Sequence, residues 1–264
     1  KTSGTSSENT GTHEFETLKV YEKSLLKWFE AKMPNVSRHQ WISLIPAYDE
    51  RPEASLSYMV STLSRVVARN PVDFLVDANY QFDPGVVLSR ILMRAEEGRP
   101  IFLLGTSFAF ARLIEDMMSL RLQTSLPDGS VFFDTGGFKG HSQELTVERY
   151  LEMIEETLGV KPSQIINEYG MTELSSQAYT TMDVQLHVFP PWSRYVIRDP
   201  RSGEISGPGE KGIVEVIDLA NVGSVLAVST MDAGIRHNRG LELCGRIDPS
   251  DLRGCSLPYE SKIC

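Results

Sequence analysis

Five consecutive residues, from Tyr169 to Glu173 with the sequence Tyr-Gly-Met-Thr-Glu, carry groups that together could bind a nucleotide. They come shortly after an apolar run of strand type at residues 165–166. The aromatic ring can stack on a base, and Gly170 lets a ligand approach the backbone closely. The Thr172 hydroxyl can bind a phosphate oxygen, and the Glu173 carboxylate can hold a hard cation such as Mg²⁺. An ordinary polar loop at a strand end would have a similar composition.

Two more segments could contact the same kind of ligand. Residues 135–140 (Thr-Gly-Gly-Phe-Lys-Gly) follow the apolar run 131–133, and a flat ligand could lie against their glycine backbone, with Lys139 adding a positive charge. Near the start of the chain, residues 2–7 are small and rich in hydroxyls, and such a loop can surround phosphates. The alternatives are a plain turn for the first segment and a terminus without fixed structure for the second.

An acid and a base near the end of the chain are candidates for binding a sugar. Asp232 ends an apolar strand, where its carboxylate could accept hydrogen bonds from both ribose hydroxyls or instead stabilise a turn. Arg246, within the sequence Gly-Arg-Ile-Asp, could contact ribose or phosphate or instead form a surface ion pair.

The three cysteines, Cys244, Cys255 and Cys264, are crowded at the end of the chain. Their odd number does not suit a disulfide framework, and their spacing does not match a zinc site. Reduced thiols are typical of a cytoplasmic protein. Cys255 follows Arg253 and Gly254, and a neighbouring guanidinium favours the reactive thiolate form, although an inert cysteine is the alternative.

Composition excludes some classes of function. The 264 residues can form one or two domains with a large core. The net charge of −9 argues against a nucleic-acid partner, which would need a basic face. No apolar run approaches the roughly 20 residues of a membrane span, and no signal peptide is visible. The first residues, Lys-Thr-Ser-Gly, do not resemble a native N-terminus, so we expect a longer protein.

The elements that must position these residues alternate between strands and helices. Apolar strand-like runs lie at 41–45, 74–76, 101–104, 131–133 and 165–166. Amphipathic patterns predict helices at 14–31, 56–67, 110–117 and 147–158, the last beginning after Thr146 and ending at Gly159. This alternation predicts a largely parallel sheet covered on both faces, with ligands binding at the carboxyl ends of its strands.

From about Pro190 the pattern changes to short strands, at 213–217 and 225–229, separated by glycine and proline, which predicts an antiparallel β section. We therefore expect an α/β lobe at 1–189, a β-rich subdomain at 190–243, and a hinge with a short C-terminal remnant at 244–264.

In their order along the chain, these segments resemble the signature of the adenylate-forming enzyme superfamily. That signature contains a Ser-Gly-Thr phosphate loop, a Gly-Gly adenine loop, a Tyr-Gly-x-Thr-Glu motif, a ribose-binding Asp and a Gly-Arg-x-Asp hinge. The matching residues are Ser3, Gly4, Thr5, Gly136, Gly137, Tyr169, Gly170, Thr172, Glu173, Asp232, Arg246 and Asp248. The resemblance implies the α/β fold of that superfamily's N-terminal domain, with mostly parallel sheets flanked by helices and followed by a β-rich subdomain.

Within the superfamily, the chain looks most like the LuxE-type acyl-protein synthetases. The segments that suggest this are 55–60, 105–110, 135–140 and 251–257. In that family a cysteine near the C-terminus carries the acyl group, and Cys255 stands at the matching position. The resemblance implies ATP and Mg²⁺ as cofactors, a fatty acid as substrate, an acyl-adenylate, and a thioester on Cys255 for delivery to a reductase partner.

The resemblance also assigns roles to the residues. Thr172, Glu173 and Cys255 would be catalytic, with Glu173 holding the metal. Tyr169 and the Gly136–Gly137 backbone would hold adenine, Asp232 and Arg246 the ribose, and Asp248 would be the hinge. Two alternatives stay open: a relative of the acyl- or aryl-CoA ligases, and a non-catalytic nucleotide-binding scaffold.

Three features depart from the superfamily pattern. Residues 5–8 read Thr-Ser-Ser-Glu, where a further glycine and a lysine are usual. The sequence ends soon after the hinge, without the usual C-terminal domain and its catalytic lysine. It also has no segment before the phosphate loop.

Overall fold

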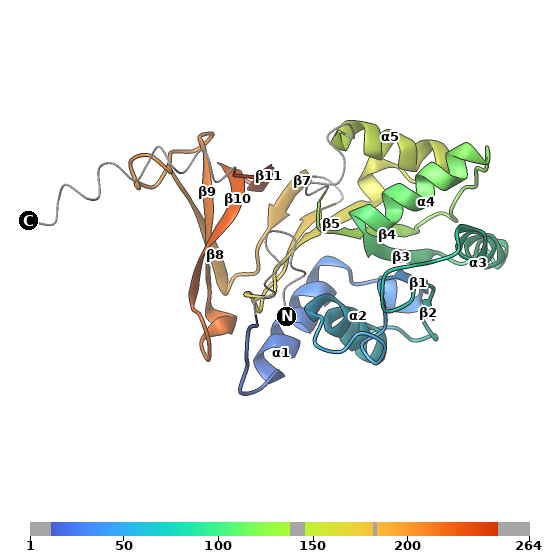
Figure 1. Ribbon diagram of the computed structural model, residues 1–264, viewed down its shortest axis with the longest axis horizontal. Helices are drawn as coiled ribbons and strands as arrows, with labels where there is room; N and C mark the ends of the chain where they lie inside the picture. The colour runs from blue at the N-terminus through green and yellow to red at the C-terminus, as the bar shows by residue number, and fades with distance from the viewer. Residues whose placement is uncertain (1–11, 138–145, 182–183, 248–264) are drawn as a thin grey trace, which may run out of the picture.

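The computed structural model describes residues 12–137, 146–181 and 184–247. In these residues the strands form one mixed sheet in the order β2-β1-β3-β4-β5-β6-β7-β11-β10-β9-β8 (Figure 1). The strands are β1 (Gln40–Leu44), β2 (Asp73–Phe74), β3 (Ile101–Thr106), β4 (Val131–Thr135), β5 (Ile165–Tyr169), β6 (Ala178–Thr181), β7 (Val184–Val188), β8 (Ser193–Arg198), β9 (Lys211–Asp218), β10 (Ala227–His237) and β11 (Gly240–Arg246).

Strands β1 to β5 form the parallel half of the sheet. The helices are α1 (Lys19–Lys32), α2 (Ser55–Val66), α3 (Pro84–Glu96), α4 (Ser107–Ser119) and α5 (Val147–Leu158). Helices α1 and α2 cover one face, and α3, α4 and α5 cover the other (Figure 1). The predicted parallel sheet with both faces covered is therefore confirmed.

In the parallel half of the sheet, successive side chains along a strand point to opposite faces. In β3, Leu103 packs with α3, α4 and α5, whereas Phe102 and Leu104 pack with α1 and α2. Each face of the sheet has its own hydrophobic cluster, so the side chains that point to either face are apolar. These strands therefore appear in the sequence as continuous apolar runs.

Helix ends agree with the sequence where a capping residue was recognised. The Thr146 side chain accepts a hydrogen bond from the Arg149 backbone at 3.2 Å, and Gly159 ends α5 with a φ of 63°. Helix α3 was not predicted. It begins after Asp83, whose carboxylate accepts hydrogen bonds from the backbone of Gly85 and Val86, with Pro84 in the first turn.

The antiparallel half begins earlier than the sequence suggested. Pairing reverses at β6, which runs antiparallel to β5, and not at about Pro190. The buried carboxylate of Asp218, at the end of β9, stabilises this reversal by accepting hydrogen bonds from the backbone of Ser175 (3.0 Å) and Ser176 (2.8 Å). A smaller hydrophobic cluster around Leu174, Val214 and Leu241 lies under this half.

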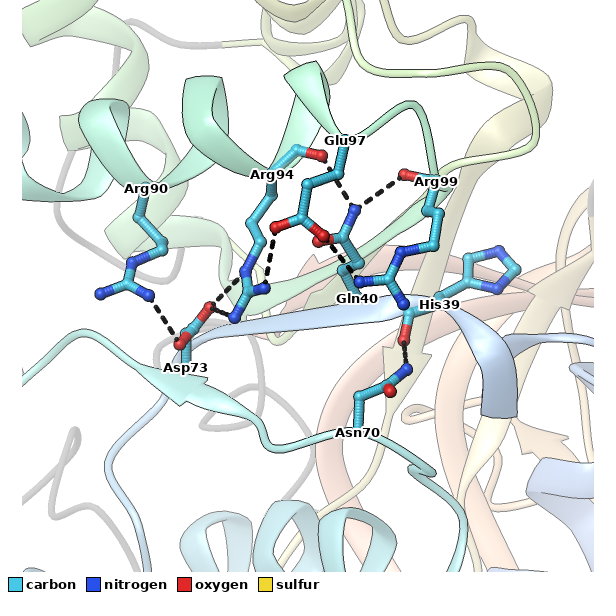
Figure 2. Close-up of polar contacts among 8 residues, drawn as sticks. All are labelled: His39, Gln40, Asn70, Asp73, Arg90, Arg94, Glu97 and Arg99. Carbon is cyan, nitrogen blue, oxygen red and sulfur yellow. Dashed lines mark hydrogen bonds and ion pairs between the residues drawn. The ribbon is translucent and has the colours of Figure 1, made fainter.

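At the amino ends of the parallel strands, charged side chains tie α3 to the sheet (Figure 2). Asp73 of β2 bonds Arg90 at 3.2 Å and Arg94 at 2.9 Å, and Arg94 also bonds Glu97 at 3.1 Å. The Gln40 amide donates to the Arg94 carbonyl oxygen at 2.8 Å. Each arginine in this network has an acidic partner. The network therefore anchors α3 at the edge of the sheet opposite the predicted ligand site.

Among the described residues, no helix is both long and apolar enough to cross a membrane.

Candidate functional site

Three predicted site residues from different strands meet at one point. Tyr169, the last residue of β5, donates a hydrogen bond from its hydroxyl to Oδ2 of Asp232 in β10, at 2.9 Å. Asp232 pairs across the sheet with Arg246 of β11, whose Nε lies 3.6 Å from Asp232 Oδ1. The topology thus brings together residues that are 63 positions apart in the sequence.

Two members of this cluster are buried, since Tyr169 is 6% exposed and Asp232 is 4% exposed, whereas the Arg246 side chain reaches solvent. Burial raises the pKa of the Tyr169 hydroxyl well above its usual value, and the negative charge of Asp232 adds to the effect. Tyr169 is therefore a permanent hydrogen-bond donor, and both carboxylate oxygens of Asp232 already have a positive or polar neighbour.

The glycine pair follows the neighbouring strand β4 and faces open space. A Cβ built on Gly136 or Gly137 would meet no atom within 4 Å. Gly136 has a φ of 89°, which favours glycine, and its backbone N–H donates to the Glu168 carbonyl oxygen at 3.4 Å. A planar ligand can therefore approach this backbone next to the end of β5.

The loop that follows Tyr169 is held from three directions. The hydroxyls of Thr172 and of Ser55, at the start of α2, form a hydrogen bond of 3.1 Å. The His13 imidazole donates from Nδ1 to the Thr172 carbonyl oxygen at 2.9 Å. The Asn221 amide donates to the Glu173 carbonyl oxygen at 2.6 Å. These contacts fix the backbone, while the Glu173 carboxylate makes no hydrogen bond or ion pair within the described residues.

Gly170 lies against the side chain of its neighbour Glu168. A Cβ at this position would overlap the Glu168 carboxylate, which is buried and accepts a hydrogen bond from the Thr135 hydroxyl. A side chain at position 170 would therefore have to displace this carboxylate.

Sequence reasoning missed several polar residues around the site. Asn167 donates from its amide to the Gly136 carbonyl oxygen at 3.3 Å, and its Oδ1 lies 2.8 Å from Nε2 of His187. The buried Asp134 accepts a hydrogen bond of 2.5 Å from the Ser107 hydroxyl, and burial raises its pKa to about 7. The available signal was the presence of polar residues within or beside otherwise apolar strands.

The remaining predicted site residues, Ser3, Gly4, Thr5, Asp248 and Cys255, lie outside the described residues. Within the described part, no three His, Cys, Asp or Glu side chains are grouped so that they could hold a metal ion.

Comparisons with known proteins identify the fold. Neither the protein-family models nor the curated proteins give a match. Among solved structures, ATP-bound MatB from Rhodopseudomonas palustris aligns with a TM-score of 0.65 and 17% identity, covering 93% of this chain and 47% of that one. A long-chain-fatty-acid-CoA ligase (FadD1) from Archaeoglobus fulgidus aligns with a TM-score of 0.62 and 15% identity, covering 91% and 50%.

O-succinylbenzoate Coenzyme A synthetase (MenE) from Bacillus subtilis, in complex with ATP and a magnesium ion, aligns with a TM-score of 0.61 and 19% identity, covering 93% of this chain and 49% of that one. The chain therefore has the α/β fold of the adenylate-forming enzymes, as predicted from the sequence. It spans about half the length of the solved structures that it matches.

Proposed function

We propose that this chain is the nucleotide-binding part of an ATP-dependent adenylate-forming ligase that activates a carboxylic acid. The observation that supports it most directly is the meeting of Tyr169, Asp232 and Arg246 beside the open backbone of Gly136. The three neighbouring structures are of two CoA ligases and of MatB bound to ATP, which favours the same class of reaction.

Each group has a part of ATP to bind. The Gly136–Gly137 backbone and Tyr169 hold adenine, and Asp232 with Arg246 holds the ribose. The Tyr169 hydroxyl already occupies one oxygen of Asp232, so a ribose hydroxyl must share or replace that bond. Thr172 binds the phosphates together with Ser3, Gly4 and Thr5.

The reaction joins an anionic acid to an anionic phosphate, so it requires neutralisation of charge. Glu173 suits Mg²⁺, because its carboxylate has no partner among the described residues and lies one residue from the phosphate-binding Thr172. Bound Mg²⁺ would withdraw charge from the phosphate oxygens.

More specifically, we propose an acyl-protein synthetase of the LuxE type. An oxygen of a fatty acid carboxylate attacks the α-phosphorus of ATP, and the bond to pyrophosphate breaks. The Cys255 thiolate then attacks the acyl carbonyl, the bond to AMP breaks, and a thioester forms on the protein for transfer to a reductase. Thr172 and Glu173 act in the first step, and Asp248 is the pivot between the steps. The proposed division at 1–189, 190–243 and 244–264 places Cys255 on the moving part.

Intact-mass spectrometry tests both steps. The protein is incubated with ATP, Mg²⁺ and a mixture of fatty acids. We expect the mass of one acyl group to be added, to be removed by hydroxylamine, and to be absent in Cys255→Ala. Exchange of pyrophosphate into ATP that depends on the acid should persist in Cys255→Ala.

Three outcomes distinguish the alternatives. Absence of exchange with every acid overturns adenylate formation and favours a nucleotide-binding scaffold. Exchange without acylation overturns the synthetase alone. Release of acyl-CoA by Cys255→Ala in the presence of coenzyme A supports a CoA ligase instead.

A further inference from the structure

A buried histidine lies behind the proposed adenine site. His187, in β7, is 6% exposed, and its Nε2 lies 2.8 Å from Oδ1 of Asn167 in β5. Asn167 stands two residues before Tyr169, and its amide nitrogen lies 3.3 Å from the Gly136 carbonyl oxygen and 3.5 Å from that of Asp134. Histidine, asparagine and glycine thus form a chain of contacts that ends at the open glycine backbone.

The directions of these hydrogen bonds are fixed by chemistry. Both backbone partners of Asn167 are carbonyl oxygens, which only accept, so the amide NH₂ must point at them. Oδ1 therefore faces His187, and Nε2 must carry the proton that it accepts. Burial lowers the pKa of His187 to about 4, so the ring is neutral near pH 7 and keeps this arrangement.

The His187 ring also contacts Tyr169, the aromatic residue of the proposed adenine site. The rings of His187 and Tyr169 meet edge to face, with centroids 6.0 Å apart. This geometry is a favourable one for aromatic pairs. His187 therefore contacts Tyr169 directly and Gly136 through one intervening side chain.

We infer that His187 is a positioning residue of the nucleotide site, which sets the Gly136 backbone through Asn167 and the Tyr169 ring through direct contact. For its ligand this inference rests on the proposed function. Loss of the Nε2 donor leaves Asn167 Oδ1 without its partner and frees the amide to rotate away from Gly136. The spacing between the glycine backbone and the aromatic ring is then no longer fixed.

A second buried histidine provides a matched control. His39 is 8% exposed, and its Nε2 donates to the Gly129 carbonyl oxygen at 3.0 Å. It precedes β1, at the opposite edge of the sheet from the glycine pair. His39→Phe and His187→Phe each exchange a buried imidazole with one Nε2 hydrogen bond for an apolar ring. His187→Gln keeps a donor near the position of Nε2.

The first measurement needs no nucleotide. Hydrogen exchange of the free protein is followed at the amides of Gly136 and Gly137. We expect faster exchange there in His187→Phe, recovery in His187→Gln, and no local change in His39→Phe. Uniformly faster exchange throughout the sheet in His187→Phe, without an excess at this loop, would overturn the inference.

The second measurement is ATP binding in the presence of Mg²⁺ by calorimetry. Because the Asn167 amide loses the partner that orients it toward Gly136, we expect the Kd of His187→Phe to rise about tenfold, with largely restored affinity in His187→Gln. In turnover, KM for ATP should rise while KM for the acid stays constant. An equal loss of ATP affinity in His39→Phe would show that only stability had changed and would overturn the inference. If the unaltered protein fails to bind ATP, the proposed function is overturned, and the exchange result alone decides the role of His187.

Discussion

Tyr169 makes two kinds of contact, of which the sequence suggested only one. The ring belongs to the proposed adenine site, whereas the hydroxyl is bonded to Asp232, the proposed ribose ligand, at 2.9 Å. Sequence reasoning recognised both residues from their motifs. It could not predict the bond between them, because that bond depends on the register of β10 against strands far away in the sequence.

We predict that Tyr169→Phe separates stability from affinity. Removal of a donor to a buried carboxylate should lower the free energy of unfolding by roughly 2 kcal/mol. The Kd for ATP should change by less than about threefold, because Asp232 loses a competitor for the ribose while the aromatic ring remains. Urea unfolding and calorimetry measure the two effects.

Tyr58→Phe is the matched control. The Tyr58 hydroxyl donates a hydrogen bond of 2.6 Å to Glu22, and this pair is not part of the proposed site. The variant should lower stability and leave ATP affinity unchanged. A loss of ATP affinity in Tyr169→Phe as large as that in Asp232→Asn would show that the hydroxyl itself binds nucleotide.

The buried Asp134 predicts a dependence of stability on pH. Burial raises its pKa to about 7 in the folded protein, so the folded state binds a proton that the unfolded state releases. This contribution to stability is complete below the unfolded pKa and is lost as pH rises through 7. His187, with its folded pKa lowered to about 4, has the opposite slope, but only below its unfolded pKa of about 6.5.

In the window from pH 6.5 to 8, Asp134 therefore contributes a slope and His187 does not. Urea unfolding should show a fall in stability of roughly 1 kcal/mol across this window, and Asp134→Asn should remove that fall. If both proteins have the same slope, another group titrates there, and the carboxyl of Asp134 is ionised throughout.

At the scale of elements, strands that are buried on both faces were easier to predict from the sequence than strands of mixed composition. Strands such as β3 and β4 are buried on both sides, so their apolar runs were recognised. Strands β6 and β7 were not recognised, because they carry the polar residues Thr180 and His187 in buried positions among apolar ones. Helix α3 was missed although Asp83 and Pro84 mark its start, because exposed apolar residues beside its buried stripe obscure the helical pattern; these are Val86, Leu92 and Met93.

One buried carboxylate stabilises the reversal between β5 and β6. Asp218 is fully buried and accepts from the backbone of Ser175 and Ser176 and from the Ser176 hydroxyl at 2.7 Å. We predict that Asp218→Asn lowers the free energy of unfolding by about 3 kcal/mol, because charge-assisted hydrogen bonds are replaced by fewer and weaker ones.

Asp199→Asn is its control, since Asp199 accepts from the backbone of Arg201 (2.6 Å) and Ser202 (2.9 Å) in an exposed turn. That variant should cost less than about 1 kcal/mol. Equal losses in urea unfolding would contradict the role of Asp218 in the reversal.

For the whole molecule, the site is shared between two unlike halves of the sheet. The parallel half contributes Gly136 and Tyr169, and the antiparallel half contributes Asp232 and Arg246 (Figure 1). The order of motifs in the sequence indicated which residues belong together. The contacts through Asn167 and His187 could not be predicted, because they reach from β5 to β7 across the intervening strand β6 and depend on the register of all three.

A ligand shared in this way must stabilise both halves together. We predict that saturating ATP with Mg²⁺ slows hydrogen exchange in β4 and β5 and equally in β10 and β11, since ATP at 100 times its Kd adds about 2.7 kcal/mol to the folded state. Asp232→Ala should abolish the protection in both halves, although the substitution lies in only one. If β4 and β5 remain protected in Asp232→Ala while β10 and β11 do not, nucleotide binds to the parallel half alone, and the contact between Tyr169 and Asp232 serves only to join the two halves.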